Sequence, residues 1–221
     1  MPRAGLNSAL VVAAGAALAD EVGYENLAMG LLAERLGVRT PSLYKHVESQ
    51  EALSRGICAT ARRELRDVLV RATVGRAGPA AVHAYADAFR DWVRRHPGRY
   101  AASIRAPEAD DEEGRQIANE HLEILYALLA GFELPGNRAV DAARGLRSVL
   151  HGFVSLENVG GFGLSRDVDR SFRFLVDSLI AGLPVAPADD DDTATHHEYH
   201  ETGGGKVPDG GSFTRPRPRR G

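Results

Sequence analysis

The polar residues between positions 39 and 46 are of the types that contact nucleic acid. Hydroxyl groups and a lysine can donate hydrogen bonds to base edges, and lysine favours guanine. Leu43 and Val47 lie four positions apart in this segment, so a short helix would bury both and expose the polar side chains. The residues that we expect to contact double-stranded DNA are Arg39, Thr40, Pro41, Ser42, Tyr44, Lys45 and His46.

The elements before this segment are arranged to position it. Leucines at 27, 31, 32 and 36 recur at helical spacing, and Gly37 follows where a left-handed cap is easiest. Thr40 is the expected cap of the second helix, with Pro41 in its first turn. Two helices joined by a short turn with glycine indicate a helix-turn-helix, whose second helix suits the major groove. An ordinary helical hairpin would explain the leucines, but not the turn and the exposed polar cluster.

The segment from about Ser8 to Leu65 resembles the TetR/AcrR family of bacterial transcriptional regulators. The resemblance implies that Tyr44 and His46 are the phosphate-contacting pair. The chain departs from the family at Ala28, which lacks a capping hydroxyl, and at Gly30 and Gln50, with Asn26 as the candidate replacement for the cap. The matching positions are Ala14, Glu21, Gly23, Leu27, Met29, Leu32, Ala33, Leu36, Gly37, Val38, Ser42, Leu43, Tyr44, His46 and Leu53.

Composition favours an all-α protein with a local nucleic-acid contact. Apolar residues make up 43% of the 221 residues, aromatic residues only 6%, and the net charge is −3. Cys58 is the single cysteine, which excludes an internal disulfide. The first twenty residues have the outline of a signal peptide, but they also form an amphipathic helix that leads into the helix-turn-helix. We therefore expect a cytoplasmic protein with no membrane partner.

The apolar pattern predicts three segments. Residues 8–50 are expected to form a three-helix helix-turn-helix domain, with Ser8 as its first cap, and residues 51–183 a helical ligand-binding and dimerisation domain. Residues 184–221 have the composition of a disordered tail, with acidic and basic runs. His196, His197 and His200 lie in this tail, where a metal-binding role would be incidental, and no metal or cofactor is expected.

The second domain supplies candidate residues for a mostly apolar effector site and for a homodimer interface. His151 and Gly152 resemble a Trp-x-x-x-His-Gly signature of one subgroup, although Arg147 stands at the tryptophan position. His151 is a candidate for the ligand cavity, but its residue type favours a hydrogen-bonded core role. The ligand candidates are Tyr85, Phe89, Trp92, Tyr100, Ile104, His121, Leu125, Tyr126, His151 and Phe153. The interface candidates are Val149, Phe153, Val168, Phe172, Leu175 and Leu179.

The sequence contains no arrangement that indicates catalysis. It has no nucleophile elbow, no phosphate loop and no paired metal ligands on a helix. The glycine run at 160–163 follows no strand, so it is interpreted as a connection between helices. The expected function is ligand-responsive repression of transcription from a palindromic operator. The alternative is an architectural or partner-binding helical DNA-binding protein without ligand control.

Overall fold

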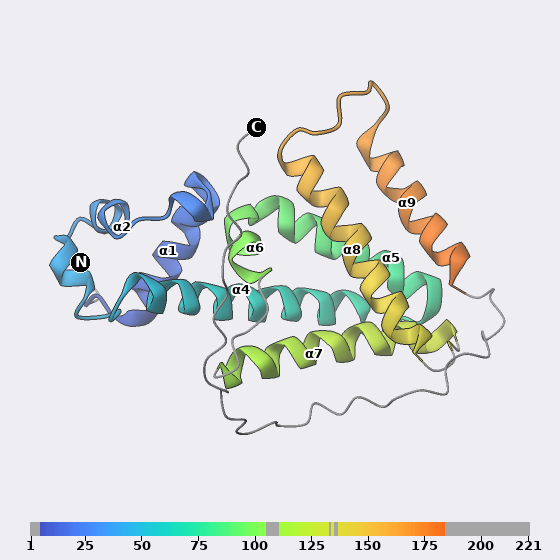
Figure 1. Cartoon of the computed structure of the whole chain (residues 1–221), viewed down its shortest axis with the longest axis horizontal. Helices are drawn as coiled ribbons and strands as arrows, with labels where there is room; N and C mark the ends of the chain where they lie inside the picture. Colours follow the sequence, from blue (N-terminus) through green and yellow to red (C-terminus); the bar gives the residue numbers. More distant parts are fainter. Residues whose placement is uncertain (1–4, 105–110, 133, 135–136, 184–221) are drawn as a thin grey trace, which may run out of the picture. The chain divides into compact units, whose positions relative to one another are not determined.

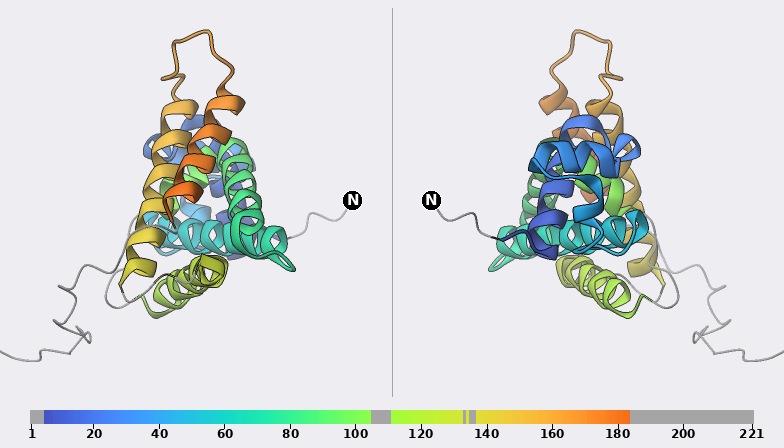
Figure 2. Two further views of the ribbon diagram at one scale, coloured as in Figure 1. Left: turned by 90° about the vertical axis from the view of Figure 1, so that its right-hand side faces the viewer. Right: turned by 90° about the vertical axis from the view of Figure 1, so that its left-hand side faces the viewer.

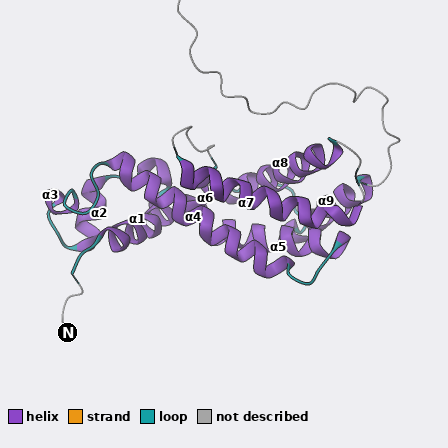
Figure 3. Ribbon diagram, turned by 90° about the horizontal axis from the view of Figure 1, so that it is seen from below, coloured by secondary structure: helices purple, strands orange, loops and turns teal. Residues whose placement is uncertain are grey.

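The computed structural model describes residues 5–104, 111–132, 134 and 137–183, and every regular element in these ranges is a helix (Figure 3). This confirms the expected all-α class. The chain divides into two units, residues 1–188 and 189–221, the second of which lies outside the described residues, as does the predicted tail. The α-helices are α1 (Ser8–Val22), α2 (Met29–Leu36), α3 (Thr40–Leu43), α4 (Gln50–Thr73), α5 (Gly78–Arg95), α6 (Pro97–Ser103), α7 (Glu112–Leu129), α8 (Arg138–Asn158) and α9 (Val168–Gly182).

Polar side chains fix several helix starts. The Leu10 N–H donates to Asn7 Oδ1 at 2.9 Å, so Asn7 caps α1 and the expectation that Ser8 would do so is wrong. Asn7 has extended backbone, which lets its side chain fold back over the first turn, whereas Ser8 is already helical. Ser49 caps α4 as expected, accepting from the Ala52 N–H at 3.1 Å.

Two apolar cores lie along α4. Leu53 and Ile57, in its first half, are buried with residues of α1, α2 and α3, whereas Ala61, Leu65 and Leu69 are buried with residues of α5, α7, α8 and α9. Figure 1 shows α4 passing from the α1–α2 region to the region of α5 and α7. The predicted boundary between residues 50 and 51 is therefore the start of a helix that both cores share.

A buried arginine joins three helices, α5, α8 and α9. In Figure 2, α9 (orange) runs beside α8 (yellow) and α5 (green). Arg90 on α5 is 8% exposed and donates to Glu157 on α8 at 2.6 and 2.8 Å and to Asp169 on α9 at 2.7 Å. Its guanidinium carbon lies 4.7 Å from the ring centroid of Phe172. Arg90 therefore contacts α9 both through Asp169 and through the Phe172 ring. These two contacts fix the position of α9 against α5 and α8.

The two cores are also joined where α6 meets α1. Gly98 packs so closely that a Cβ atom there would lie 2.0 Å from the Ala19 carbonyl oxygen. Asp20 accepts the Arg99 backbone N–H at 2.8 Å, and its second oxygen lies 3.1 Å from Arg99 Nε and 3.2 Å from His96 Nδ1. The end of α1 is thus held on the first turn of α6 by backbone contact and by a shared carboxylate.

Replacing Gly98 by alanine should destabilise the protein by at least about 3 kcal/mol, because the clash is with backbone that no rotamer change can relieve. Gly30→Ala is the control, since a Cβ atom there meets nothing within 4 Å. This control should be neutral or more stable by up to about 1 kcal/mol. Urea unfolding followed by circular dichroism measures both variants. Equal stability of the two variants would contradict the backbone contact.

Candidate nucleic-acid interface and effector domain

The turn after α2 has the geometry that the sequence predicts. Gly37 has φ 64° and ψ 32°, the left-handed conformation that a residue without Cβ adopts without strain. Its N–H donates to the Glu34 carbonyl and the Val38 N–H to the Ala33 carbonyl, both at 3.0 Å, which is a Schellman cap. The chain therefore leaves α2 in a single fixed direction, and that direction sets where α3 begins.

Helix α3 is a single turn, and two buried apolar residues, one in α3 and one after it, anchor it and the turn that follows. Leu43 is fully buried and Val47 is 5% exposed, and the Val47 N–H donates to the Leu43 carbonyl at 3.0 Å. The cap position is Arg39, with extended backbone and no side-chain capping bond, so the expectation that Thr40 caps the helix is wrong. Thr40 already lies inside the helix, just before Pro41, where its hydroxyl does not reach the free N–H groups.

The seven residues expected to contact DNA form one continuous stretch over α3 and the turn that follows it. Arg39, Pro41, Tyr44 and Lys45 are exposed, Tyr44 at 50%, whereas Thr40, Ser42 and His46 are half-buried. Among the described residues, none forms an ion pair with the Lys45 side chain. An exposed lysine without an ion pair among the described residues, beside three half-buried side chains with hydroxyl or imidazole groups, can donate hydrogen bonds to a nucleic acid.

Polar contacts join the helices and loops next to this stretch. Arg35 on α2 makes a bidentate contact with Glu21 on α1, and the hydrogen bond from Arg35 lowers the pKa of that carboxyl. Gln50 Nε2 donates to the Leu27 carbonyl at 3.1 Å, a role that the sequence did not suggest. Asn26 donates to the Val22 carbonyl at the end of α1, so its predicted capping of α2 is wrong.

An aromatic cluster lies in the second core. Tyr85 and Phe89 on α5 are stacked with ring centroids 6.4 Å apart, and Tyr100 on α6 meets Phe89 edge-on at 5.5 Å. The Tyr100 hydroxyl lies 2.8 Å from Nδ1 of His151 on α8. This bond joins α6 to α8, so His151 has the hydrogen-bonded core role that the sequence left open.

The remaining ligand candidates separate into two groups. Trp92, Leu125 and Phe153 are buried, and His121 is half-buried, so they lie in or against the second core. Ile104 and Tyr126 are both 39% exposed, so they lie at the surface of the protein. In the sequence, Arg147 stands out only because it occupies the tryptophan position of the Trp-x-x-x-His-Gly signature. Its spacing of four residues from His151 is the signal that places both side chains on one flank of α8.

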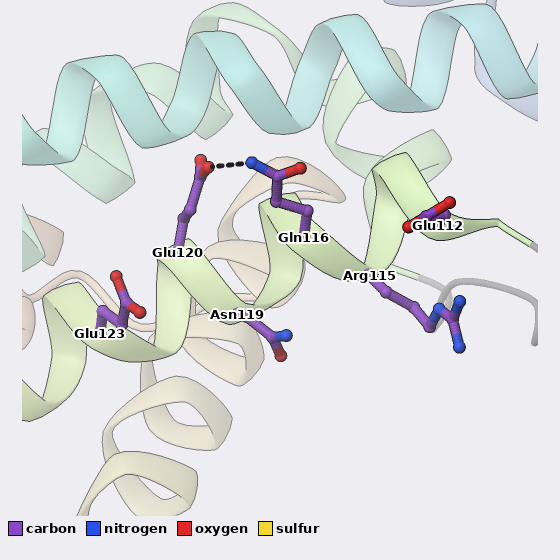
Figure 4. A pocket seen from close by; sticks show the side chains of 6 residues that line it. All are labelled: Glu112, Arg115, Gln116, Asn119, Glu120 and Glu123. Carbon is purple, nitrogen blue, oxygen red and sulfur yellow. Dashed lines mark hydrogen bonds between the residues drawn. The ribbon is translucent and has the colours of Figure 1, made fainter.

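The grooves that the structure describes are open and polar. One, of about 600 Å³, lies entirely on α7 and contains none of the ligand candidates. Glu120 and Gln116 lie on the side of α7 that faces α4, whereas Arg115 and Asn119 point away from it (Figure 4). A second groove, of about 610 Å³, runs between α5 and α9 and is lined mainly by arginines and aspartates.

The six interface candidates are not equally accessible. Phe153 is 9% and Phe172 is 2% exposed, with their rings 5.1 Å apart in the second core. These two side chains offer little area to another molecule because they are covered by Arg90 and by each other. The other four, which are half-buried on α8 and α9, are Val149, Val168, Leu175 and Leu179.

Comparison with known proteins follows the same division of the chain. Residues 11–56 match the family model described as bacterial regulatory proteins, tetR family, and residues 82–179 match the one described as tetracyclin repressor-like, C-terminal domain. An uncharacterized HTH-type transcriptional regulator of Mycobacterium tuberculosis is 37% identical over 165 residues, which are 74% of this chain and 75% of that protein. The regulator YobS of Bacillus subtilis is 28% identical over 185 residues, 83% of this chain and 96% of that protein.

Solved structures show the same fold. A variant of TetR from Acinetobacter baumannii AYE, solved in complex with minocycline, is 26% identical and has a TM-score of 0.62. The match covers 82% of this chain and 100% of that chain. Among the described residues of this chain, no helix has the length and apolarity needed to cross a membrane. The chain belongs to the TetR family of bacterial regulatory proteins, and it is a DNA-binding transcriptional regulator rather than an enzyme.

Proposed function

We propose that this regulator is a homodimeric repressor that binds a palindromic operator and leaves it when a small organic effector binds. The exposed polar stretch over α3 carries the proposal, because it is anchored by buried apolar residues and its lysine forms no ion pair with any described residue. Each copy would place α3 in the major groove, with the two helices about 34 Å apart, one turn of DNA. Because its partner is chromosomal DNA, the regulator would act in the cytoplasm.

The residues of the stretch have different roles in this proposal. Thr40, Ser42 and Lys45 would contact base edges, and Tyr44 and His46 would contact phosphates on either side. The start of α2 adds to these contacts. Ala28 provides no side-chain cap there, so the first N–H groups of α2 remain available to a phosphate oxygen.

The dimer would form through the outer faces of α8 and α9. Buried residues occupy only one side of each helix, and the opposite side carries small and apolar residues that are exposed or half-buried. Phe174 is 70% and Leu156 is 51% exposed, and small neighbours allow close approach of a second helix. The residues of this outer face are Gly145, Val149, Gly152 and Leu156 on α8, with Ser171, Phe174, Leu175 and Ser178 on α9.

Effector control would act through the second core and α6. The proposed contacts are the aromatic candidates that lie in the second core or against it, and the solved complex of a related regulator with minocycline supports control by a small organic molecule. Tyr100 on α6 is bound to α8, while Gly98 and Arg99 of the same helix hold α1. An effector that changes one attachment of this seven-residue helix would therefore change the other.

The open and polar character of the described grooves favours a second candidate, an architectural DNA-binding protein without ligand control. Release of labelled operator DNA in the presence of a metabolite panel separates the two functions. Release by at least one compound supports the repressor. Unchanged binding across the panel, with the operator still recognised, supports the architectural protein.

Lys45→Ala should weaken operator binding by about 1–3 kcal/mol and relax the preference at one base position, because a donor to a base edge is lost. Arg71→Ala is the control, since Arg71 is equally exposed but lies near the end of α4. Fluorescence anisotropy against a set of single-base operator variants measures both effects. Unchanged affinity and preference in Lys45→Ala would show that α3 does not dock as proposed.

Glutamates at Val149 and Phe174 together should raise the dimer Kd by at least about 100-fold, because four unpaired charges would enter the symmetric interface. Val74→Glu is the control, an apolar residue that is 72% exposed but lies after α4. Light scattering with size-exclusion chromatography gives the oligomeric state of each variant. A wild-type protein that is monomeric at micromolar concentration would rule out this interface.

A further inference from the structure

One flank of α8 carries a polar row that faces the second core. Arg147, His151 and Ser155 follow one another at intervals of four residues, so they share a side of the helix. His151 Nδ1 lies 2.8 Å from the Tyr100 hydroxyl and 3.5 Å from Ser155 Oγ. The row is therefore directed toward α6, and its first member is an arginine.

A second polar group approaches from α7. His121 Nε2 is buried and has no hydrogen-bond partner among the described residues. Burial lowers the pKa of His121 to about 4, and its other ring nitrogen is hydrogen-bonded to the Ile117 backbone. The ring is therefore neutral near pH 7, and Nε2 is a lone-pair acceptor without a donor. Such a group is costly to leave unpaired in a folded protein.

Arg147, the exposed first member of the row, is the cation whose charge acts on these groups. Burial raises the pKa of Tyr100 to about 12 and that of Tyr85 further, and the charge of Arg147 opposes both shifts. The same charge also acts on His121, so it influences groups on α5, α6 and α7. The guanidinium forms no ion pair with any residue that the structure describes, whereas Arg66, which also acts on His121, is bound by Asp67 and Glu120.

We propose that the effector is an organic acid, whose carboxylate binds Arg147 and the hydroxyls of Tyr85 and Tyr100 while its apolar body packs on Phe89 and Leu125. A hydroxyl or amide N–H of the same molecule would donate to His121 Nε2. The cluster has two tyrosine hydroxyls and one cation without an ion pair among the described residues, and no carboxylate of those residues is bonded to any of the three, which favours an anion as the ligand. Arg147 is also accessible to solvent, so an anion can reach it. This inference rests on the proposed effector control.

The test compares acids with their neutral counterparts. The probes are 4-hydroxybenzoate, 4-hydroxyphenylacetate, cinnamate and octanoate, each beside its primary amide, in titrations of the full-length protein and of its operator complex. At least one acid should bind and release the operator, and its amide should bind about 10-fold or more weakly. Arg147→Gln should lower acid affinity by roughly 10- to 100-fold. Arg144→Gln is the control, because Arg144 is exposed one turn earlier and acts on none of the three groups.

Histidine NMR provides a readout that does not depend on the choice of probe. Arg147→Gln should raise the pKa of His121 because a nearby positive charge is removed, and Arg144→Gln should leave it unchanged. An unchanged His121 pKa in Arg147→Gln would overturn the cluster. Release by the amides as strongly as by the acids would overturn the acid inference and leave effector control intact. If neither series releases the operator, the acid inference fails, and failure of the wider metabolite panel would remove effector control as well.

Discussion

The contact between α1 and α6 is the constraint on which both halves of the molecule depend. Gly98 lets the two backbones touch, and Asp20 then binds the Arg99 N–H and lies beside the His96 ring. Because the partner at the closest point is a backbone carbonyl, the spacing cannot adapt by a change of rotamer. The polar stretch over α3 packs on α1 and α2, so its position relative to the second core follows from this joint and from the shared helix α4.

The charged side chains of this protein differ in whether other residues of the chain bind them. Lys45 and Tyr44 are exposed, and Lys45 makes no ion pair with any residue that the structure describes, so both side chains are open to solvent at little cost in stability. Arg90, in contrast, is buried and satisfied by Glu157, Asp169 and the Phe172 ring, which makes it structural. Arg147 acts on the second core's polar cluster but has no such partners in the described part of the chain, and this difference is the basis for proposing it as a ligand contact.

Local signals in the sequence predicted the helix-turn-helix well. Gly37 at the left-handed cap, the buried pair Leu43 and Val47, and the Ser49 cap are all as expected, since each depends on residues within one or two turns. The caps assigned to Ser8, Thr40 and Asn26 were wrong. A capping bond depends on which residue has extended backbone, and a difference of one position is below what residue types alone can decide.

The sequence by itself determined the helical class, the order of the helices and the exposed polar stretch, because periodicity and capping are short-range properties. Tertiary structure alone decided which side chains meet across helices. Phe153 and Phe172 have the apolar character of interface residues but cover each other and Arg90, and the surface candidates Ile104 and Tyr126 look identical to core residues in the sequence. The pairing of Tyr100 with His151, fifty-one residues apart, and the unpaired His121 Nε2 exist only once α6, α7 and α8 are packed. Hydrophobic patterning shows that a helix face is buried, whereas tertiary packing decides which residues cover that face.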